Sequence, residues 1–248
     1  MKNIILLYSM IGTILLFSSC TEEVITPEPV MESIDIAAAN LTAKNTDLTD
    51  VTYLGAAATK VNVTPARQQA VDDSMAVGTM IGPEAYATLP VEMYTGIVEF
   101  DMAIQLNQYA NPFSRGFAGL AYRLQDDGVT YEGIYARGTN GLLNDPFPSA
   151  TQVIHGLQYF SEPNYHFLAL RASHPEVYEK PASIAIDTWH HYKYVIGEST
   201  TAIYIDNAPA PSMTVDNQFS VTNSGKVALW IGTSTDAYFK DLTVTVIK

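Results

Sequence analysis

The stretch of sequence that decides the fold spans residues 96–104 and reads GIVEFDMAI. Alternate positions in it carry large apolar side chains: Val98, Phe100, Met102 and Ile104. Glu99 and Asp101 lie between them. Because successive side chains of an extended chain point to opposite faces, this period of two predicts a strand with one buried and one solvated face.

Segments of the same kind recur on both sides of this stretch, rich in β-branched and aromatic residues. We predict strands at residues 51–63, 116–123, 131–137, 189–196, 201–207, 227–232 and 237–246. Helical periodicity is almost absent, although Pro65 fits the first position of a short helix over residues 65–71. After Arg137 a loop of about 45 residues lacks strong periodicity, and loops of that length are often functional. The pattern predicts an all-β domain of two packed antiparallel sheets with one long loop excursion.

The N-terminal residues have the features of a secretory signal. An apolar run of about 14 residues follows Lys2, which is shorter than the roughly 20 residues of a membrane-spanning helix. It ends in Leu16-Phe17-Ser18-Ser19-Cys20, which resembles a bacterial lipobox, in which the cysteine becomes the lipidated first residue. The alternative is an ordinary cleaved signal with a cysteine there by chance. We predict three parts: a lipoprotein signal peptide at 1–19, a lipid-anchored tether at 20–45 and the sandwich domain at 46–248.

This organisation predicts an outer-membrane lipoprotein of a bacterial cell envelope, either periplasmic or surface-exposed. Glu22 and Glu23 follow the cysteine and resemble the surface-export tag of some Gram-negative lipoproteins, with a solvated linker as the alternative. Cys20 is the only cysteine, so no internal disulfide is expected. The formal net charge of −13 argues against nucleic acid and anionic lipid surfaces as partners.

The predicted strand at 131–137 gathers side chains that suit a sugar. Alternation places Tyr131, Gly133, Tyr135 and Arg137 on one face and sends Glu132 to the other. Tyrosine combines an apolar ring with a polar tip, and the planar guanidinium of arginine holds hydroxyl or carboxylate groups. The alternative is an ordinary cross-strand aromatic pair beside a solvated arginine.

Long polar side chains also gather in the loop that follows. They are His155, Gln158, Tyr159, Asn164, Tyr165 and Arg171. Taken alone, His155 is interpreted as a structural histidine. With the strand residues, this group favours a polar, ring-bearing ligand such as a sugar.

The sequence gives little indication of a metal site or of a pair of catalytic carboxylates. His190 and His191 are adjacent, so on a strand they point to opposite faces and cannot ligate one metal ion. Asp126 and Asp127 precede Gly128 and indicate a turn in place of a calcium site. Glu99 and Asp101 share a face, at a separation near that of the paired carboxylates of glycosidases. The glucanases of this architecture have a third acid two or three residues further on, where this chain has Ala103 and Ile104. We therefore interpret this face as a solvated strand face. No metal or cofactor is expected.

With these residues in view, the chain resembles the concanavalin A-like lectin and glucanase group over roughly residues 90–245. Within it, the chain resembles bacterial secreted domains labelled domain of unknown function 1080 or 3-keto-disaccharide hydrolase-like. The matching residues are 119–123, 131–141, 155–159, 178–179, 189 and 229–239. Two residues depart from the sequence pattern of this group. Gly138 stands at a position where the group usually has proline, and Phe167 stands near a position where it usually has tryptophan.

The resemblance implies a jelly-roll sandwich with a carbohydrate-facing side, and a strand or loop in place of the short helix at 65–71. It implies ligand-binding roles for eight residues: Arg123, Tyr135, Arg137, Asn140, His155, Gln158, Tyr159 and Arg171. It also directs attention to Glu132.

Three functions remain open. The first is a lectin-like protein that binds a glycan or glycoconjugate and is tethered to the membrane through Cys20. The second is an enzyme that hydrolyses glycosides or eliminates from an oxidised sugar, with His155 or Glu132 as the catalytic proton-transfer group and Arg137 stabilising negative charge. The third is a structural surface protein, which predicts Arg137, Arg171 and Glu132 buried as satisfied pairs without a cleft.

Overall fold

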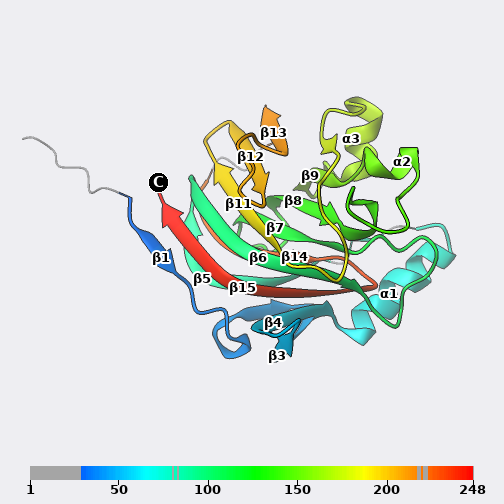
Figure 1. Cartoon of the computed structure of the whole chain (residues 1–248), viewed down its shortest axis with the longest axis horizontal. Coiled ribbons are helices and arrows are strands. Elements are labelled where there is room, and N and C mark those ends of the chain that lie inside the picture. Colours follow the sequence, from blue (N-terminus) through cyan, green and yellow to red (C-terminus); the bar gives the residue numbers. More distant parts are fainter. Residues whose placement is uncertain (1–28, 80, 83, 217–218, 220–222, 248) are drawn as a thin grey trace, which may run out of the picture.

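The computed structural model describes residues 29–79, 81–82, 84–216, 219 and 223–247 as a sandwich of two antiparallel sheets (Figure 1). The all-β two-sheet prediction is confirmed. The signal peptide, Cys20 and residues 21–28 of the predicted tether lie outside the described residues.

One sheet has eight strands, in the order β13-β12-β11-β6-β15-β4-β3, and β1 pairs with β15 outside this path. Its strands are β1 (Met31–Ser33), β3 (Thr46–Tyr53), β4 (Ala56–Val63), β6 (Gly96–Leu106), β11 (His190–Ile196), β12 (Thr200–Ile205), β13 (Met213–Asp216) and β15 (Thr235–Val246). The other sheet has seven strands, in the order β10-β9-β8-β7-β14-β5-β2. Its strands are β2 (Thr42–Lys44), β5 (Ala85–Met93), β7 (Phe117–Leu124), β8 (Tyr131–Arg137), β9 (Leu157–Glu162), β10 (Glu179–Lys180) and β14 (Gly225–Ile231).

The alternation that predicted β6 places its apolar face in the core between the sheets. Val98, Phe100, Met102 and Ile104 are all buried there. The Phe100 ring stacks on Tyr192 and Tyr194 of β11, with centroid distances of 5.8 and 5.6 Å. Burial of these rings removes a large apolar area from water, which is the main stabilising contribution to such a core.

The ordered domain begins earlier than residue 46, so the predicted boundary of the tether at residue 45 is wrong. Two short strands, β1 and β2, pair with β15 and β5. Ile36 and Leu41 between them are buried in the core. Strands of three residues are too short to show a period of two, which is why the sequence pattern did not reveal them.

Residues 65–71 lie in a helix, α1 (Pro65–Ala76), so the strand or loop implied by the family resemblance is wrong there. The local signals explain the helix. Pro65 occupies its first turn, and the Thr64 side chain accepts a hydrogen bond from the backbone N–H of Arg67 as an N-cap.

The predicted loop excursion contains regular structure. It includes the 3₁₀ turn η2 (Gly138–Asn140), α2 (Ala150–Val153), β9, α3 (Phe167–Ser173) and the two-residue strand β10. β9 pairs along β8 and extends the seven-stranded sheet towards β10. The excursion therefore contributes two strands, β9 and β10, to the seven-stranded sheet that also contains β8.

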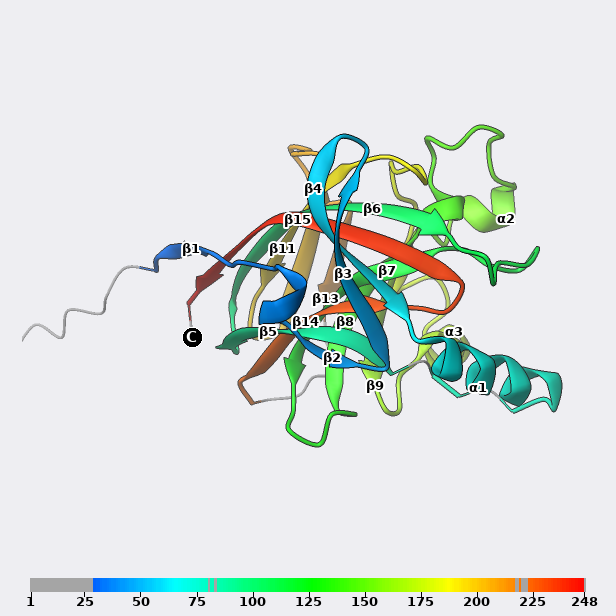
Figure 2. The ribbon, with the colours of Figure 1, turned by 90° about the horizontal axis from the view of Figure 1, so that it is seen from below.

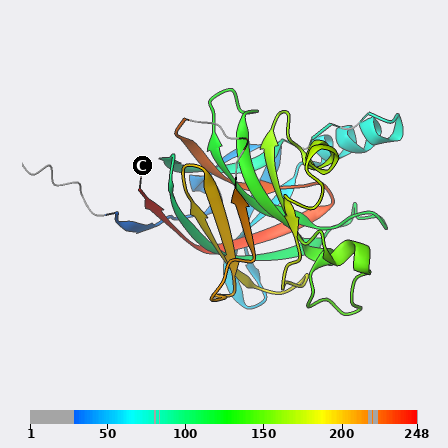
Figure 3. The ribbon, with the colours of Figure 1, turned by 90° about the horizontal axis from the view of Figure 1, so that it is seen from above.

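The helices α1, α2 and α3 lie at the end of the sandwich opposite β1 and the last residues of β15. In Figures 1, 2 and 3, α1, α2 and α3 gather at one end, whereas β1 and the C-terminal end of β15 lie at the other. Within the described residues, no helix is both long and apolar enough to cross a membrane.

Candidate functional site

A cavity of about 760 Å³ lies over the outer face of the seven-stranded sheet. Tyr131, Tyr135 and Arg137 of β8 line it, together with residues of α1, of segment 111–117, of α2 and of α3. We call it the β8 cleft. The three helices that contribute to it lie at the end of the sandwich opposite β1, where the described chain enters the fold (Figure 2).

The floor of the β8 cleft is aromatic. Tyr135 stacks on Trp230 of β14 at a centroid distance of 4.9 Å, and Phe160 of β9 packs between Tyr131 and Trp230. The space beside Gly133 is filled by Phe160, because a Cβ there would lie 2.6 Å from the Phe160 ring. The floor rings expose at most 7% of their surface, so they support the cleft more than they face solvent.

Glu179 of β10 organises the polar end of the cleft. Its Oε1 accepts hydrogen bonds from Arg137 Nη1 (2.7 Å) and Arg171 Nη2 (2.6 Å). Its Oε2 accepts one from Arg171 Nε (2.7 Å) and lies 3.1 Å from His155 Nδ1. One buried carboxylate therefore orients two guanidinium groups and an imidazole. Burial opposes its ionisation, but the hydrogen bonds and charges of Arg171 and Arg137 outweigh burial and hold the pKa of Glu179 below its usual value.

The two arginines of this cluster differ in what they can offer a ligand. Arg137 is 4% exposed and donates to four acceptors: the carbonyl of His155, Glu179, the Tyr135 hydroxyl and Gln158. It is almost saturated, since a guanidinium has five N–H donors. The side chain of Arg171 is 37% exposed, and its only acceptor among the described residues is Glu179. Arg171 therefore presents N–H donors to the cleft, whereas Arg137 is buried and holds the neighbouring side chains in place through its hydrogen bonds.

His155 lies beside the Glu179 carboxylate with its side chain 25% exposed. Burial lowers the pKa of His155, and the carboxylate of Glu179 only partly offsets this effect. Burial therefore favours the neutral form of the imidazole.

Besides His155 Nδ1, whose only close partner is the Glu179 carboxylate, three buried polar atoms on residues that line the cleft lack hydrogen-bond partners in the described part of the chain. They are Asn140 Oδ1, His166 Nδ1 and Trp230 Nε1. Asn140 is 3% exposed, and its amide nitrogen donates to the carbonyl of His155, which fixes the side chain. An unpaired buried acceptor costs about 1–3 kcal/mol. A hydroxyl group of a ligand would satisfy it.

The opposite end of β8 is acidic. Glu162, which pairs across the strands with Tyr131, and Glu84 both line the cleft. Burial, followed by the charge of Glu84, raises the pKa of Glu162. From Tyr131 to Arg137 the strand rises by about 20 Å. The cleft is thus polarised, with carboxyl groups at one end and guanidinium groups at the other.

The structure brings together five of the eight predicted ligand-binding residues in the β8 cleft. They are Tyr135, Arg137, Asn140, His155 and Arg171. Gln158 does not line the cleft but accepts a hydrogen bond from Arg137 and donates to two backbone carbonyls. Tyr159 and Arg123 lie on the inner side of the sheet, where Tyr159 donates to Glu132 at 2.7 Å.

Arg123 and Glu132 form an ion pair inside the sandwich, and neither side chain is exposed to solvent. Arg123 Nη1 donates to Glu132 Oε1 at 2.9 Å, and its other nitrogens donate to the backbone carbonyls of Tyr94 and Gly197. Glu132 thus lies on the face opposite Arg137, as strand alternation predicted. Glu132 is remote from the cleft, so of the two candidate catalytic residues only His155 lines it.

Several residues in the cleft or directly beneath it were not predicted as site residues. Glu179 and Trp230 lay within the matched segments, but no local pattern connected them to Arg137. Glu162 and Phe160 follow the His155–Tyr159 motif directly. Extending the period of two through β9 would have placed Phe160 on the face of Gln158 and Tyr135.

The outer face of the eight-stranded sheet carries the other candidate residues. Glu99 pairs with Lys193 and Asp101 with Lys240, and His191 lies between the two acids. His190 points the other way, is buried, and hydrogen-bonds to Asp206. No group of three potential metal ligands occurs among the described residues.

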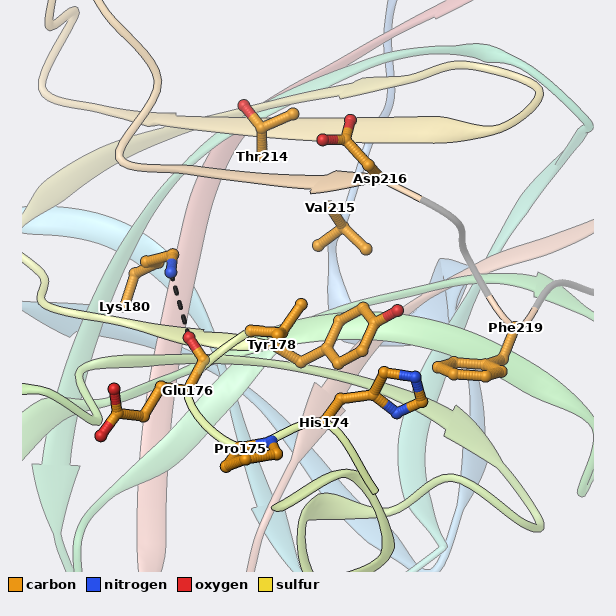
Figure 4. Close-up of a pocket in the computed structure, with 10 residues that line it drawn as sticks. His174, Pro175, Glu176, Tyr178, Lys180, Thr214, Val215, Asp216 and Phe219 are labelled. Carbon is orange, nitrogen blue, oxygen red and sulfur yellow. Dashed lines mark hydrogen bonds between the residues drawn. The ribbon is translucent and has the colours of Figure 1, made fainter. Parts of the chain in front are cut away.

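A second cavity of about 700 Å³ lies where β10 and β13 form the edges of the two sheets (Figure 4). The rings of His174, Tyr178 and Phe219 pack against one another on one side of it, at centroid distances of 5.3–5.6 Å. Asp216 of β13 lies across from them. None of the predicted ligand-binding residues lines this cavity.

The lowered pKa of Glu179 predicts acid sensitivity. A carboxyl group whose folded-state pKa lies below its unfolded value stabilises the fold above the unfolded pKa, and that contribution is lost as the pH falls. We expect the free energy of unfolding, measured with urea, to decline below about pH 4.5, the region where unfolded glutamate takes up protons. Glu179→Gln should show a shallower decline, and an unchanged slope would contradict this assignment.

Comparison with solved structures identifies the architecture. The carbohydrate-binding module CBM66 from Bacillus subtilis aligns with a TM-score of 0.52 and 14% identity, over 83% of this chain and 95% of that one. A Bacillus licheniformis beta-glucanase aligns with a TM-score of 0.47 and 11% identity, over 90% and 100%. A Bacillus subtilis protein of unknown function with a galectin-like fold gives 0.45 and 10%, over 89% and 91%. The first of these alignments confirms the concanavalin A-like sandwich fold expected from the sequence. No family model and no curated protein sequence matches the chain.

Proposed function

We propose that this protein is a carbohydrate-binding lipoprotein that holds a glycan in the β8 cleft. The observation that carries the proposal is the unpaired acceptor Asn140 Oδ1, buried in a cleft that also presents the donors of Arg171. Sugar hydroxyls donate and accept hydrogen bonds, so one ligand class satisfies both groups. The aromatic floor, at most 7% exposed, supports these polar groups from beneath and keeps water away from their inner side.

The rest of the fold supports this function. Protein sites for polar ligands are concave and place a few polar groups over an apolar lining, as the β8 cleft does. The cleft also counts against a purely structural role for Arg137 and Arg171, because that role predicted no cleft. The fold shared with a carbohydrate-binding module is compatible with the proposal, although at 14% identity it adds only the architecture.

The location is part of the proposal. Lipidation of Cys20 would anchor the chain to the outer membrane of a bacterial cell, on its periplasmic or external side. β1 enters the sandwich at the end opposite the helices, so an anchor beyond it would be attached at the end away from α1, α2 and α3 (Figure 1). The narrower resemblance to domain of unknown function 1080 remains a prediction.

The test is calorimetry with glycans selected on an array, using the full-length protein. Asn140→Ala removes the unpaired acceptor, and we expect it to weaken binding by about tenfold, as expected for one hydrogen bond to a neutral partner. Asn62→Ala on β4 is the matched control, because Asn62 also donates to a backbone carbonyl but lies in the other sheet. Absence of glycan binding, or equal effects of the two variants, would refute the proposal.

A second function, catalysis on glycosides, is favoured by one observation. The imidazole of His155, whose pKa is lowered by burial, lies next to the carboxylate of Glu179 and within the same cleft as Arg171. This geometry suits a general base that removes a proton from a sugar, with guanidinium donors stabilising the negative charge that develops. Product analysis after incubation with the bound glycan decides between the two functions: His155→Gln should abolish turnover in an enzyme and leave a binding protein's affinity nearly unchanged.

A further inference from the structure

The charge balance of the β8 cleft points to the class of sugar it binds, and this inference rests on the proposed function. Three of the five arginines in the sequence line the cleft: Arg115, Arg137 and Arg171. Arg115 lies at the same end as Arg137, because its carbonyl accepts a hydrogen bond from the backbone of Thr139. This end of the cleft is therefore strongly basic in a chain whose net charge is −13.

The carboxylates at this end do not balance the arginines. Glu179 is the only acidic partner of Arg137 and Arg171 in the described part of the chain. Among the described residues, the Arg115 side chain donates only to the backbone carbonyls of Pro112 and Ser114. The end of the cleft therefore holds more guanidinium charge than carboxylate charge. A partly buried cation without a counter-ion is costly, so the arrangement is more stable when an anion occupies the cleft.

The geometry of Arg171 identifies where the anion binds. Its Nε and Nη2 atoms form a two-pronged contact with the two oxygens of Glu179. That contact uses one edge of the planar guanidinium and fixes its plane. The other edge, formed by Nη1 and the second N–H of Nη2, has no acceptor among the described residues. A planar carboxylate matches such an edge with two parallel hydrogen bonds.

The negative net charge of the protein does not prevent this recognition. At physiological ionic strength the Debye length is about 8 Å, so distant surface carboxylates are largely screened. Glu162 and Glu84 lie at the Tyr131 end of β8, about 20 Å along the strand from Arg137. The field of the nearby arginines therefore dominates at Arg171.

We propose that the β8 cleft binds an acidic sugar, with the carboxylate of a uronic acid residue held by the free edge of Arg171. Asn140 accepts a hydrogen bond from a hydroxyl of the same ligand. The polarity of the cleft then sets the direction of the glycan chain, with its uronate at the Arg171 end and neutral residues towards Tyr131.

The experiment compares acidic oligosaccharides with the same sugars made neutral. Oligogalacturonates, oligoglucuronates and oligomannuronates, their methyl esters, neutral glucans and fructans, and a sulfated neutral oligosaccharide are titrated into the full-length protein by calorimetry. We expect at least one uronate to bind at least about tenfold more tightly than its methyl ester, because esterification removes a charge-assisted pair of hydrogen bonds.

Three variants locate the effect. Arg171→Gln should remove the preference for the acid over the ester, and Arg171→Lys should keep part of it, because lysine retains the charge without the planar edge. Lys193→Gln changes the net charge equally but lies on the other sheet, paired with Glu99, and should preserve the preference. Thermal unfolding of each variant verifies that it is folded.

The outcomes separate this inference from the proposed function. Tight binding of neutral glycans that is unaffected by Arg171→Gln would overturn the acidic-sugar assignment and leave the carbohydrate-binding function intact. Binding of the sulfated sugar without any uronate would overturn the carboxylate assignment. Absence of binding by every glycan would refute both.

Discussion

Glu132→Ala is expected to destabilise the protein by about 3–5 kcal/mol, because it leaves the guanidinium of Arg123 buried without its counter-ion. Both side chains of this pair are fully buried, and Arg123 Nη1 lies 2.9 Å from Glu132 Oε1. For a domain of this size, that loss corresponds to a decrease in Tm of about 6–20 °C. Thermal unfolding followed by circular dichroism measures the decrease.

A double variant distinguishes the loss of an ion pair from the loss of packing. Arg123→Met with Glu132→Leu replaces both charges by apolar groups, and such replacements of buried pairs are often neutral or stabilising. We expect the double variant to recover most of the Tm. Glycan binding should survive in it, since the pair lies on the inner side of the sheet. If Glu132→Ala kept its Tm but lost ligand binding, Glu132 would have to act on the ligand.

The inward position of Arg123 illustrates what the sequence could not reveal. By alternation along β7, Leu120 and Tyr122 point inward, and Arg123 should point outward. The pairing of β7 with β14 is interrupted by a β-bulge between Lys226 and Ala228, and Arg123 has a left-handed backbone with φ of 53°. A bulge turns one residue out of the alternation, so Tyr122 and Arg123 both enter the core.

β8 shows which features local periodicity can predict. Its bounds at 131 and 137 were predicted from alternation alone, and so was the separation of Glu132 from Arg137. The same rule failed for Glu179, because β10 has two residues and its place beside β9 depends on pairing between distant segments. The charge cluster of the cleft is therefore a product of sheet topology, and no spacing in the sequence encodes it.

α1 shows the opposite situation, in which a local rule was sufficient. Pro65 at the first position predicted a short helix over residues 65–71, whereas the likeness to other sandwich domains favoured a strand or loop. α1 contributes Val71, Asp72 and Met75 to the wall of the β8 cleft. The element that departs from the expected pattern thus shapes the site of this protein.

Glu179→Ala is expected to remove both stability and ligand binding. Arg137 is 4% exposed and would lose its only carboxylate partner in the described residues, at a cost of about 3–5 kcal/mol. Arg171 would lose both hydrogen bonds that fix its plane, so its free edge would no longer be held towards a ligand. Thermal unfolding and calorimetry with the best glycan measure the two effects. Glu176→Ala, three residues earlier and exposed, is the control and should preserve binding.

The two effects of Glu179→Ala can be separated by removing the buried charge as well. In Glu179→Ala with Arg137→Met, no buried guanidinium remains unpaired, and we expect most of the lost stability to return. Binding should stay weak, because nothing restores the orientation of Arg171. Preorganised donors contribute to affinity since the cost of ordering them is met when the protein folds. If the double variant regained binding together with stability, Glu179 would be needed only for folding, and the positioning role assigned to it would be wrong.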